Sequence, residues 1–456
     1  MLIREWVDFL GVLYRRGAFH IMLSTFANKF VVFFGTVVVV RLLSKEEYGL
    51  VSYVENIYGY VLIFAGWGLA NGLLRYVVLA APAQKGAYFH YVLRGSLVRN
   101  ALLAALLLAG NACVTYPLEF AAARDWVPVM ALLLPLQDLV KDGRFALRAV
   151  FCNQLYANLT LLLTLGLLLG RVAGAWLAGV GGVLWSRVLV NGGFAVAAVW
   201  LAWRAIRSVA GQAATQAEAV TGAAGRGAAP TAAETRTTQS VQAVPLTQAE
   251  RRELNVYSAQ YMLTNGLWAL FLLNDTFLLG WLGPGPQALA EYKAALVVPG
   301  VLALLANAIG MFLTPYFTRH EQERAWLWRR WQQSLAVTAG LTGLAALLLA
   351  LLAEPLIAVV YGPAYASIAP LLRLLVGAQF IYSGLGYITV TLLAAVGEIR
   401  WNIRISLVGM VLQVLVGVTI IPSYGAYGAA VANAAAFALM VVLVTWAFVR
   451  RYRART

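Results

Sequence analysis

The chain has 456 residues, of which 61% are hydrophobic and 12% charged, and its mean hydropathy of +0.76 is far above that of a soluble protein. This composition excludes a water-soluble domain of any size and predicts an integral membrane protein. The formal net charge of +15 does not indicate nucleic-acid binding, since the chain has no basic soluble module with interleaved aromatic residues. Membrane topology and anionic lipid headgroups account for the basic excess.

Charged residues, prolines and glycine clusters divide the sequence into twelve apolar stretches, each long enough to cross a hydrocarbon layer of roughly 30 Å as a helix. The first stretch lacks a small-residue cleavage site, so we expect a retained helix and not a signal peptide. The predicted fold class is an all-α polytopic membrane protein with about twelve transmembrane helices. Their approximate ranges are 17–42, 50–79, 88–115, 124–149, 154–170, 174–207, 253–282, 288–318, 326–353, 366–395, 399–420 and 426–449.

A low-complexity stretch, residues 208–250, separates two halves of six predicted helices each. It is rich in Ala, Thr, Gln and Gly and poor in large apolar residues, so it cannot bury enough surface to order itself. We predict a six-helix bundle over 1–207, a flexible cytoplasmic linker over 208–250 with a short helix from about Thr247, and a second six-helix bundle over 251–456.

The distribution of Lys and Arg predicts the orientation in the membrane. With a cytoplasmic N-terminus, 26 of the 34 Lys and Arg residues fall on the inner side, four fall on the outer side and four lie within helices. The positive-inside rule then places both termini in the cytoplasm.

The two halves carry similar sequence landmarks. A shift of 239 residues aligns "RLLSKEEYGLVSY" (41–53) with "GWLGPGPQALAEY" (280–292), and "GAWLA" at 174–178 resembles "GAYGA" at 425–429. These matches favour two parallel six-helix repeats. Repeats of this kind place a substrate site between the halves near the midplane and move by rocking one half against the other.

The landmarks also resemble a family. "VVVVRLLSKEEYGLVS", "GWGLANGLLRY", "NDTFLLGWLG" with "EYKAALVVPG", "VVYGPAYASIAPLLRLL", "AAVGEIRWN" and "SYGAYGAAVANA" are similar, in order, to the landmarks of bacterial polysaccharide flippases. These are the Wzx-type translocases of the multidrug/oligosaccharidyl-lipid/polysaccharide (MOP) exporter superfamily. The superfamily also contains lipid II flippases, usually with fourteen helices, and multidrug antiporters, usually with twelve. The predicted count of twelve departs from the lipid II flippases.

The resemblance implies a V-shaped, MATE/MOP-like pair of six-helix bundles in the bacterial cytoplasmic membrane. Such a protein moves an undecaprenyl-pyrophosphate-linked oligosaccharide from the inner to the outer leaflet for cell-surface polysaccharide synthesis, such as that of O-antigen. The implied partners are the lipid-linked oligosaccharide, membrane lipids, and the polysaccharide polymerase and glycosyltransferases of the same pathway.

Ionisable residues inside the predicted helices are the main candidates for binding, because a charge near the bilayer centre costs roughly 2.5–3.5 kcal/mol and must face a cavity or a partner. Cations there can hold pyrophosphate. The alternatives are a structural ion pair, snorkelling to the interface, ties to backbone carbonyls or a topogenic role. The candidate substrate-binding cations are Lys29, Arg75, Arg187, Lys293 and Arg373.

Three acids are candidates for coupling transport to an ion. Asp275 interrupts the seventh helix beside Asn274 and either takes up a proton or sodium ion or makes an interhelical hydrogen bond. Asp138 and Asp142 share one face of the fourth helix with Lys141, which indicates either a salt-bridge network at the inner interface or a role in gating or coupling.

Aromatic residues are frequent, with 21 Tyr and 14 Trp. Sugar rings stack on aromatic faces, whereas packing and anchoring at the membrane interface are the alternative roles. The candidate sugar-contacting residues are Tyr53, Tyr58, Trp67, Tyr261 and Trp268.

Motifs for chemical catalysis are absent from the sequence. No lysine follows a glycine, which excludes a Walker A loop, and no two aspartates lie two apart. We therefore expect no enzymatic activity, no metal and no cofactor. The rival functions are a MATE-like drug or cation antiporter, an integral membrane polysaccharide polymerase or ligase, and a non-transporting scaffold. The antiporter prefers acids in its cavity, and the enzymes usually carry a large external loop.

Overall fold

The computed structural model describes residues 31–224 and 245–452, and every regular element in these ranges is a helix. After an apolar helix at Val31–Leu42, the N-terminal half contains α3 (Lys45–Ile63), η1 (Ala65–Gly68), α4 (Leu69–Leu79), η2 (Pro82–Gln84), α5 (Lys85–Cys113), η3 (Leu118–Phe120), α6 (Ala123–Ala149) and α7 (Asn153–Ala224). The C-terminal half contains α9 (Gln248–Leu282), α10 (Pro286–Val297), α11 (Gly300–Arg319), α12 (Arg324–Leu351), α13 (Ala353–Val360), η4 (Pro363–Ile368), α14 (Ala369–Phe380), the π-helical η5 (Ile381–Gly386), α15 (Tyr387–Ala395) and α16 (Ile399–Tyr452).

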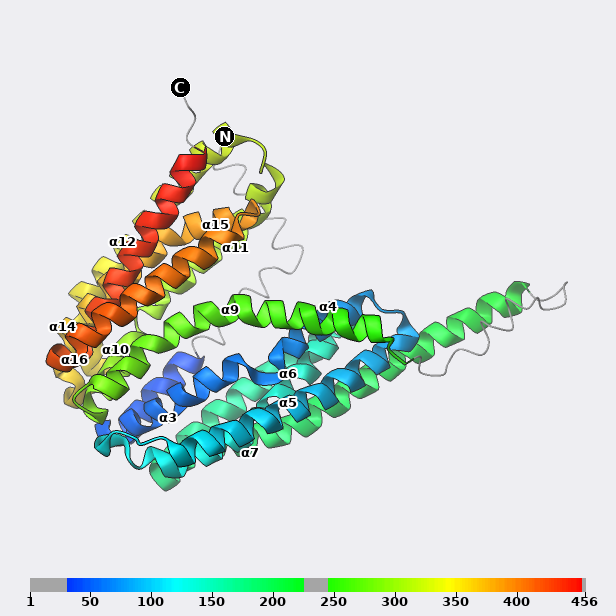
Figure 1. The fold of residues 1–456 in the computed structure, drawn as a ribbon, viewed down its shortest axis with the longest axis horizontal. Helices are drawn as coiled ribbons and strands as arrows, with labels where there is room; N and C mark the ends of the chain where they lie inside the picture. Colours follow the sequence, from blue (N-terminus) through cyan, green and yellow to red (C-terminus); the bar gives the residue numbers. More distant parts are fainter. Residues whose placement is uncertain (1–30, 225–244, 453–456) are drawn as a thin grey trace.

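The helices form two groups that converge at one end and diverge at the other, so that the molecule is V-shaped (Figure 1). α3 to α7 make the N-terminal group, and α11 to α16 make the C-terminal group. α9 runs between them and packs along α16 and against α3 and α4. At the convergent end α3 packs against α10. The two halves of the sequence therefore meet mainly through α3, α4, α9 and α10.

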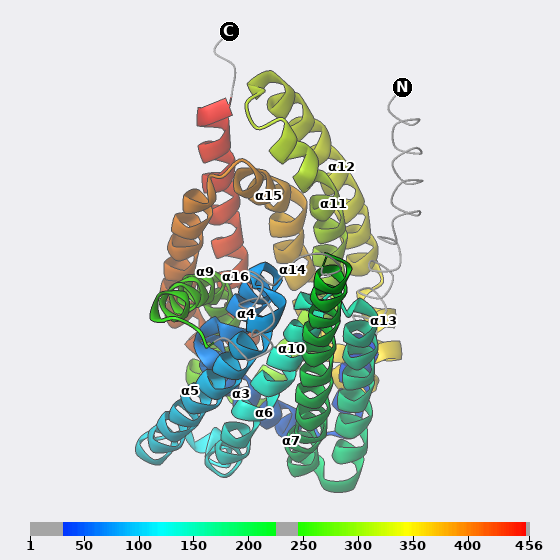
Figure 2. The same ribbon diagram turned by 90° about the vertical axis from the view of Figure 1, so that its right-hand side faces the viewer.

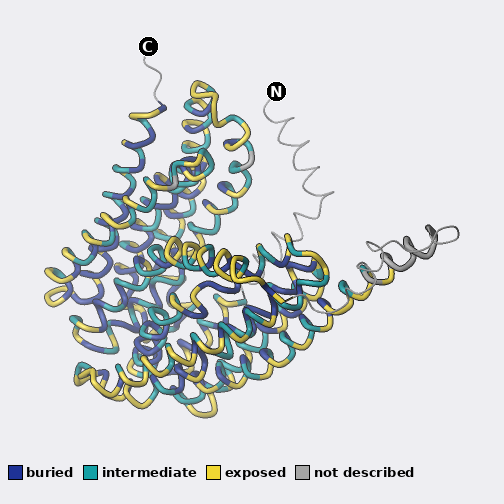
Figure 3. Tube along the Cα trace, turned by 45° about the vertical axis from the view of Figure 1, so that its right-hand side comes forward, coloured by how far each residue is buried: buried dark blue, intermediate teal, exposed yellow. Residues whose placement is uncertain are grey.

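Apolar side chains cover the outside of both groups. Among the described residues, eight helices are long and apolar enough to cross a membrane, and only 11% of the most apolar window of α12 is buried inside the protein. Figure 3 shows buried residues concentrated where helices meet and exposed residues along the outer helix faces. An apolar outer surface of this extent fits a bilayer. The predicted all-helical polytopic membrane fold is confirmed, while the number of twelve crossings and the cytoplasmic termini stay predictions.

Two of the long helices reverse direction at a glycine. α7 turns at Gly179 (φ 55°, ψ −131°) and α16 turns at Gly425 (φ 52°, ψ −125°). These backbone angles strongly favour glycine. Gly170 packs against Val190, and Gly409 packs against Met440, so the two arms of each hairpin lie side by side (Figure 2).

The two hairpins are structural counterparts, and the equivalence corrects our alignment. Gly179 and Gly425 have nearly the same angles, and "GVGGVLWSR" (179–187) corresponds to "GAYGAAVAN" (425–433). The pairing of 174–178 with 425–429 was therefore wrong by five residues. That alignment paired Gly174 with Gly425 because the residues that follow them are similar. In the structure, the glycine with a positive φ at the turn of α7 is Gly179. In the correct register, Arg187 corresponds to Asn433.

Close packing at the α7 hairpin provides a test of this geometry. A Cβ on Gly182 would overlap the carbonyl oxygen of Gly174, whereas a Cβ on Gly193 would meet nothing within 4 Å. We expect Gly182→Ala to destabilise the protein by about 1–3 kcal/mol, as overpacking does, and Gly193→Ala to be neutral or slightly stabilising. Thermal unfolding of the purified variants measures both. Equal melting temperatures for the two variants would contradict the hairpin packing.

Reciprocal capping boxes set the first residues of α3 and α9. The Ser44 hydroxyl accepts from the Glu47 backbone N–H and the Glu47 carboxylate accepts from the Ser44 N–H, while Thr247 and Glu250 repeat the arrangement. Each box satisfies backbone donors that the first helical turn leaves unpaired. The helix expected from about Thr247 is confirmed. At the other end of the predicted linker, α7 continues as a helix to Ala224.

The second predicted helix is broken in the structure. Between α3 and α4 the chain passes through Gly66 (φ 53°), Trp67 (φ 52°) and Gly68 (φ 75°). Three successive residues in the left-handed region cannot continue a right-handed helix. In transporters, breaks of this kind occur where the backbone borders a binding site. We call residues 64–68 the α3–α4 break.

Candidate functional site

Polar contacts between the two halves close the convergent end. Lys45 of α3 forms an ion pair with Glu291 of α10 at 2.5 Å. The Arg41 guanidinium donates to the carbonyl oxygen of Val360 at 2.8 Å, and Gln287 donates to Glu46. The Lys45 and Gln287 contacts hold α3 against α10, and the Arg41 contact joins the helix Val31–Leu42 to α13. All three must break if this end opens.

The Lys45–Glu291 pair gives a test of that closure. Its side chains are 22% and 28% exposed, so we expect a coupling energy of about 0.5–1 kcal/mol. Lys45→Glu and Glu291→Lys should each lower thermal stability, and the double variant should recover most of the loss. A double-mutant cycle on melting temperatures measures the coupling. Purely additive effects would mean that the pair does not hold the halves together.

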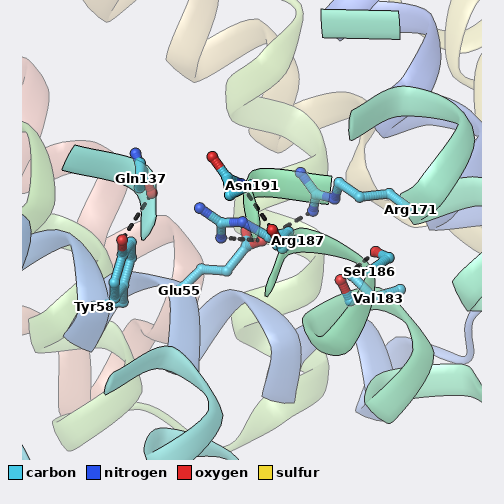
Figure 4. Close-up of polar contacts among 8 residues, drawn as sticks. All are labelled: Glu55, Tyr58, Gln137, Arg171, Val183, Ser186, Arg187 and Asn191. Atoms are coloured by element: carbon cyan, nitrogen blue, oxygen red, sulfur yellow. Dashed lines mark hydrogen bonds and ion pairs between the residues drawn. The ribbon is translucent and has the colours of Figure 1, made fainter. Parts of the chain in front are cut away.

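Two arginines pair with one carboxylate near the meeting of the two halves (Figure 4). Glu55 of α3 pairs with Arg187 at 2.8 Å and with Arg171 at 3.1 Å, one from each arm of the α7 hairpin. Lys293 of α10 also attracts the Glu55 carboxylate electrostatically. We call Arg171, Arg187, Lys293 and Glu55 the central basic cluster. Its arginines and Glu55 are 18–26% exposed, so a ligand can approach them.

The Glu55 carboxylate and an aromatic ring hold the Arg187 guanidinium in place. The guanidinium lies over the Tyr58 ring, 5.4 Å from the centroid, and the Arg187 backbone carbonyl accepts from the Asn191 amide at 2.7 Å. The Tyr58 hydroxyl donates to Gln137 at 2.7 Å (Figure 4). A guanidinium held in place in this way can offer two parallel N–H bonds to a phosphate with little loss of entropy.

A second polar site surrounds Asp275, which is 3% exposed. One carboxylate oxygen accepts from the Tyr292 hydroxyl at 2.6 Å and from the Asn433 amide at 3.4 Å. The other accepts from the backbone N–H and hydroxyl of Thr276. Asp275 therefore ties α9 to α10 and α16. The Lys293 ammonium lies 3.5 Å from the Thr276 hydroxyl and attracts Asp275, so it links this site to the central basic cluster.

The carboxylates Asp138 and Asp142 lie apart from both sites, in the N-terminal group. They are buried on α6 beneath the α3–α4 break, and Asp138 accepts from the Asn100 amide at 2.8 Å. Within the described ranges, no group of three or more His, Cys, Asp or Glu residues is placed to hold a metal ion.

The structure brings together only part of the predicted binding set. Arg187 and Lys293 belong to the central basic cluster. Arg75 is exposed on α4 over the Tyr257 ring, 5.0 Å from its centroid. Arg373 is exposed and pairs with Glu354 at 2.8 Å, away from the cluster. Lys29 lies outside the described residues.

The predicted aromatic set is scattered. Tyr53 stacks on Phe120 at 4.2 Å, and Trp268 packs in the C-terminal group against Phe271 and Tyr382. Trp67 and Tyr261 are 45% and 40% exposed. Only Tyr58 touches the central basic cluster.

A lateral cavity of about 490 Å³ lies between α3, α5 and α9. Its lining is mostly apolar and includes Tyr53, Tyr60 and Phe277, and it is bordered by Leu106 and Trp281, which are 60% and 46% exposed on the outer surface. Tyr53 and Tyr60 thus line an apolar space that suits a hydrocarbon chain better than a sugar.

Sequence reasoning missed the carboxylate at the centre of the cluster. Glu55 interrupts an apolar helix as Asp275 does, which is the signal that would have identified it. Arg171 falls between the predicted helices 154–170 and 174–207 and so was not a candidate for a charge inside a helix. Its ion pair with Glu55 depends on the α7 hairpin, which brings Arg171 and Arg187 to the same Glu55 carboxylate.

Comparisons with known proteins identify the fold. No family model and no curated protein matches the sequence. Among solved structures, the lipid II flippase MurJ in an inward closed conformation is similar with a TM-score of 0.64 at 12% identity, over 93% of this chain and 86% of that chain. An inward-facing multidrug resistance MATE family transporter of the MOP superfamily gives 0.66 at 12% identity, over 93% and 94%. An outward-facing MATE transporter gives 0.55 at 12% identity, over 95% and 96%.

These likenesses show that the chain has the fold of MOP-superfamily transporters. The predicted MATE/MOP-like fold class is confirmed, and the Wzx subtype stays a prediction. The matched proteins are transporters and not enzymes.

Proposed function

We propose that the protein is a flippase that carries a pyrophosphate-linked glycolipid, of the undecaprenyl-pyrophosphate oligosaccharide class, across the bacterial cytoplasmic membrane by alternating access. The observation that carries this proposal is the central basic cluster. Arg171 and Arg187 share one carboxylate, Glu55, and Lys293 acts on both Glu55 and Asp275. Three cations beside two carboxylates leave a net positive charge, which favours an anionic headgroup.

The position of the cluster fits a translocation step. Arg171 and Arg187 come from the N-terminal group, and Lys293 comes from α10 in the second half of the chain. A headgroup bound between them would touch both halves at once and could follow them as they rock. Glu55 would release its arginines to the phosphates on binding and take them back after release.

The lateral cavity supports a substrate with a hydrocarbon tail. It lies on the lipid-facing side of α3, α5 and α9 and offers mostly apolar surface. A tail held there would stay in contact with the bilayer while the polar headgroup enters between the halves. The tail then never needs to cross a polar region.

The greater likeness to the inward-facing MATE structure than to the outward-facing one favours an inward-facing state. In that state the divergent end of the V, where α16 ends at Tyr452, opens to the cytoplasm (Figure 1). The substrate would be loaded there by the enzymes that build it, and the polymerase would receive it on the outer side.

Transport by purified protein in liposomes tests the function against its main rival. One sample contains a fluorescent undecaprenyl-pyrophosphate oligosaccharide in the inner leaflet, and its appearance in the outer leaflet is followed. A second sample follows the efflux of an organic cation. We expect movement of the glycolipid and no cation efflux. Cation efflux without glycolipid movement would replace the flippase with a MATE-like antiporter.

A further inference from the structure

A buried pair of carboxylates lies outside the transport site. Asp138 and Asp142 are one helical turn apart on α6 and are 4% and 0% exposed. The carboxylate oxygens of Asp142 and the hydroxyl of Ser96 on α5, which is 1% exposed, make no hydrogen bond of good geometry among the described residues, although Ser96 lies close enough to act on both carboxylates. A Cβ on Gly66 would lie 3.2 Å from the Ser96 hydroxyl and 3.1 Å from the Asp138 carboxyl carbon, so Ser96 faces the same space.

The surroundings of Asp142 do not compensate a negative charge. Lys141 of α6 and Tyr58 of α3 act electrostatically on the pair, but the Lys141 ammonium lies over the Phe145 ring at 5.9 Å. Behind the pair, Gly143 packs against the backbone of Ala198 on α7, which brings no charge. A buried carboxylate without a partner costs several kcal/mol when ionised. Two ionised carboxylates one turn apart are therefore unfavourable in this buried site.

Hydrogen bonds connect the pair to the α3–α4 break. The Asn100 side chain bridges the two: its Nδ2 donates to Asp138, and its Oδ1 accepts from the Gly66 backbone N–H at 2.9 Å. On the other side, Arg99 donates to the Gly66 carbonyl at 3.4 Å and to Asn255 of α9 at 2.6 Å. The break is thus held between the acid pair and α9.

We propose that Asp142, together with Asp138 and Ser96, is a proton-binding site whose occupancy sets the geometry of the α3–α4 break. A proton from water forms an O–H bond on Asp142, which can then donate to Asp138 or Ser96. When that bond breaks and the proton returns to water, two negative charges remain one turn apart in a dry site. Opening of the break toward water relieves their repulsion and moves α4 relative to α9.

Only the role of this proton in the transport cycle rests on the proposed function; the proton-binding site itself does not. In that cycle, proton release would accompany one conformational change and proton uptake the reverse. The site itself can be tested without any substrate, so its failure and the failure of the flippase proposal are distinguishable.

Infrared spectroscopy of the full-length protein in lipid tests the proton site directly. At neutral pH we expect the carbonyl stretching band of a protonated carboxylic acid in the wild type. The band should be lost in Asp142→Asn and kept in the control Asp125→Asn, whose aspartate is exposed at the start of α6. A band unaffected by Asp142→Asn, or no such band at neutral pH, would overturn the assignment.

Hydrogen exchange tests the link to the break. In the wild type, amide exchange over residues 64–79, corrected for its intrinsic pH dependence, should rise severalfold between mildly acidic and alkaline pH. In Asp142→Asn, which imitates the protonated acid, the corrected exchange should not change with pH. Asp125→Asn should behave as the wild type. The same pH response in Asp142→Asn and the wild type would exclude control of the break by this proton.

Discussion

Replacement of Arg187 by alanine is expected to weaken binding of the pyrophosphate-linked substrate by about 1.5–3 kcal/mol, roughly tenfold to a hundredfold in affinity. Arg187 is the cluster residue whose guanidinium is held by both an ion pair, to Glu55, and an aromatic ring, that of Tyr58. Its loss removes two charge-assisted bonds to phosphate. Transport at subsaturating substrate should fall by a similar factor.

Arg187→Lys separates charge from geometry. Lysine keeps the positive charge but cannot form two parallel bonds or stack as a plane on Tyr58, so we expect less than half of the lost binding energy to return. Arg404→Ala is the control, because Arg404 is exposed on α16 and contacts Trp401. Liposome transport at varied substrate concentration measures all three variants. Normal affinity in Arg187→Ala would remove the cluster from the substrate site.

Replacement of Asp275 by asparagine is expected to abolish the stimulation of transport by an imposed ion gradient while leaving substrate exchange without a gradient intact. Asparagine keeps an oxygen that can accept from Tyr292, so the contacts between α9, α10 and α16 largely persist. It removes the charge that attracts Lys293. The central basic cluster would then no longer respond to an ion bound at Asp275.

The measurement compares glycolipid movement with and without proton, sodium or potential gradients in wild type, Asp275→Asn and Asp275→Ala. The alanine variant should also be less stable by about 1–3 kcal/mol or more, because the Tyr292 hydroxyl and the Asn433 amide lose their acceptor. A gradient effect that survives in Asp275→Asn would show that Asp275 only ties helices together.

The sequence contained enough to predict the membrane fold. Long apolar stretches must form helices in lipid, since no water is available for unpaired backbone groups, and the repeated landmarks near residues 41–53 and 280–292 indicated two related halves. The Thr247 start of α9 followed from local capping, which depends on neighbours within one turn. These are properties of short segments, and the sequence specifies them directly.

The site could be predicted only in part because burial and partners depend on distant segments. Arg373 and Arg187 look alike in sequence, yet Arg373 is exposed with Glu354 and Arg187 joins Glu55. Glu55 and Arg171 belong to the site because the α7 hairpin packs against α3 and brings their side chains together.

The sequence by itself determined that the chain is a helical membrane protein with charged groups inside its apolar stretches, and it predicted two related halves. The tertiary structure alone decided which of these charges meet. Hydropathy and capping are local quantities, whereas the ion pairs between α3 and both arms of α7 require a turn at Gly179 and bring together Glu55 and Arg187 across a sequence separation of 132 residues.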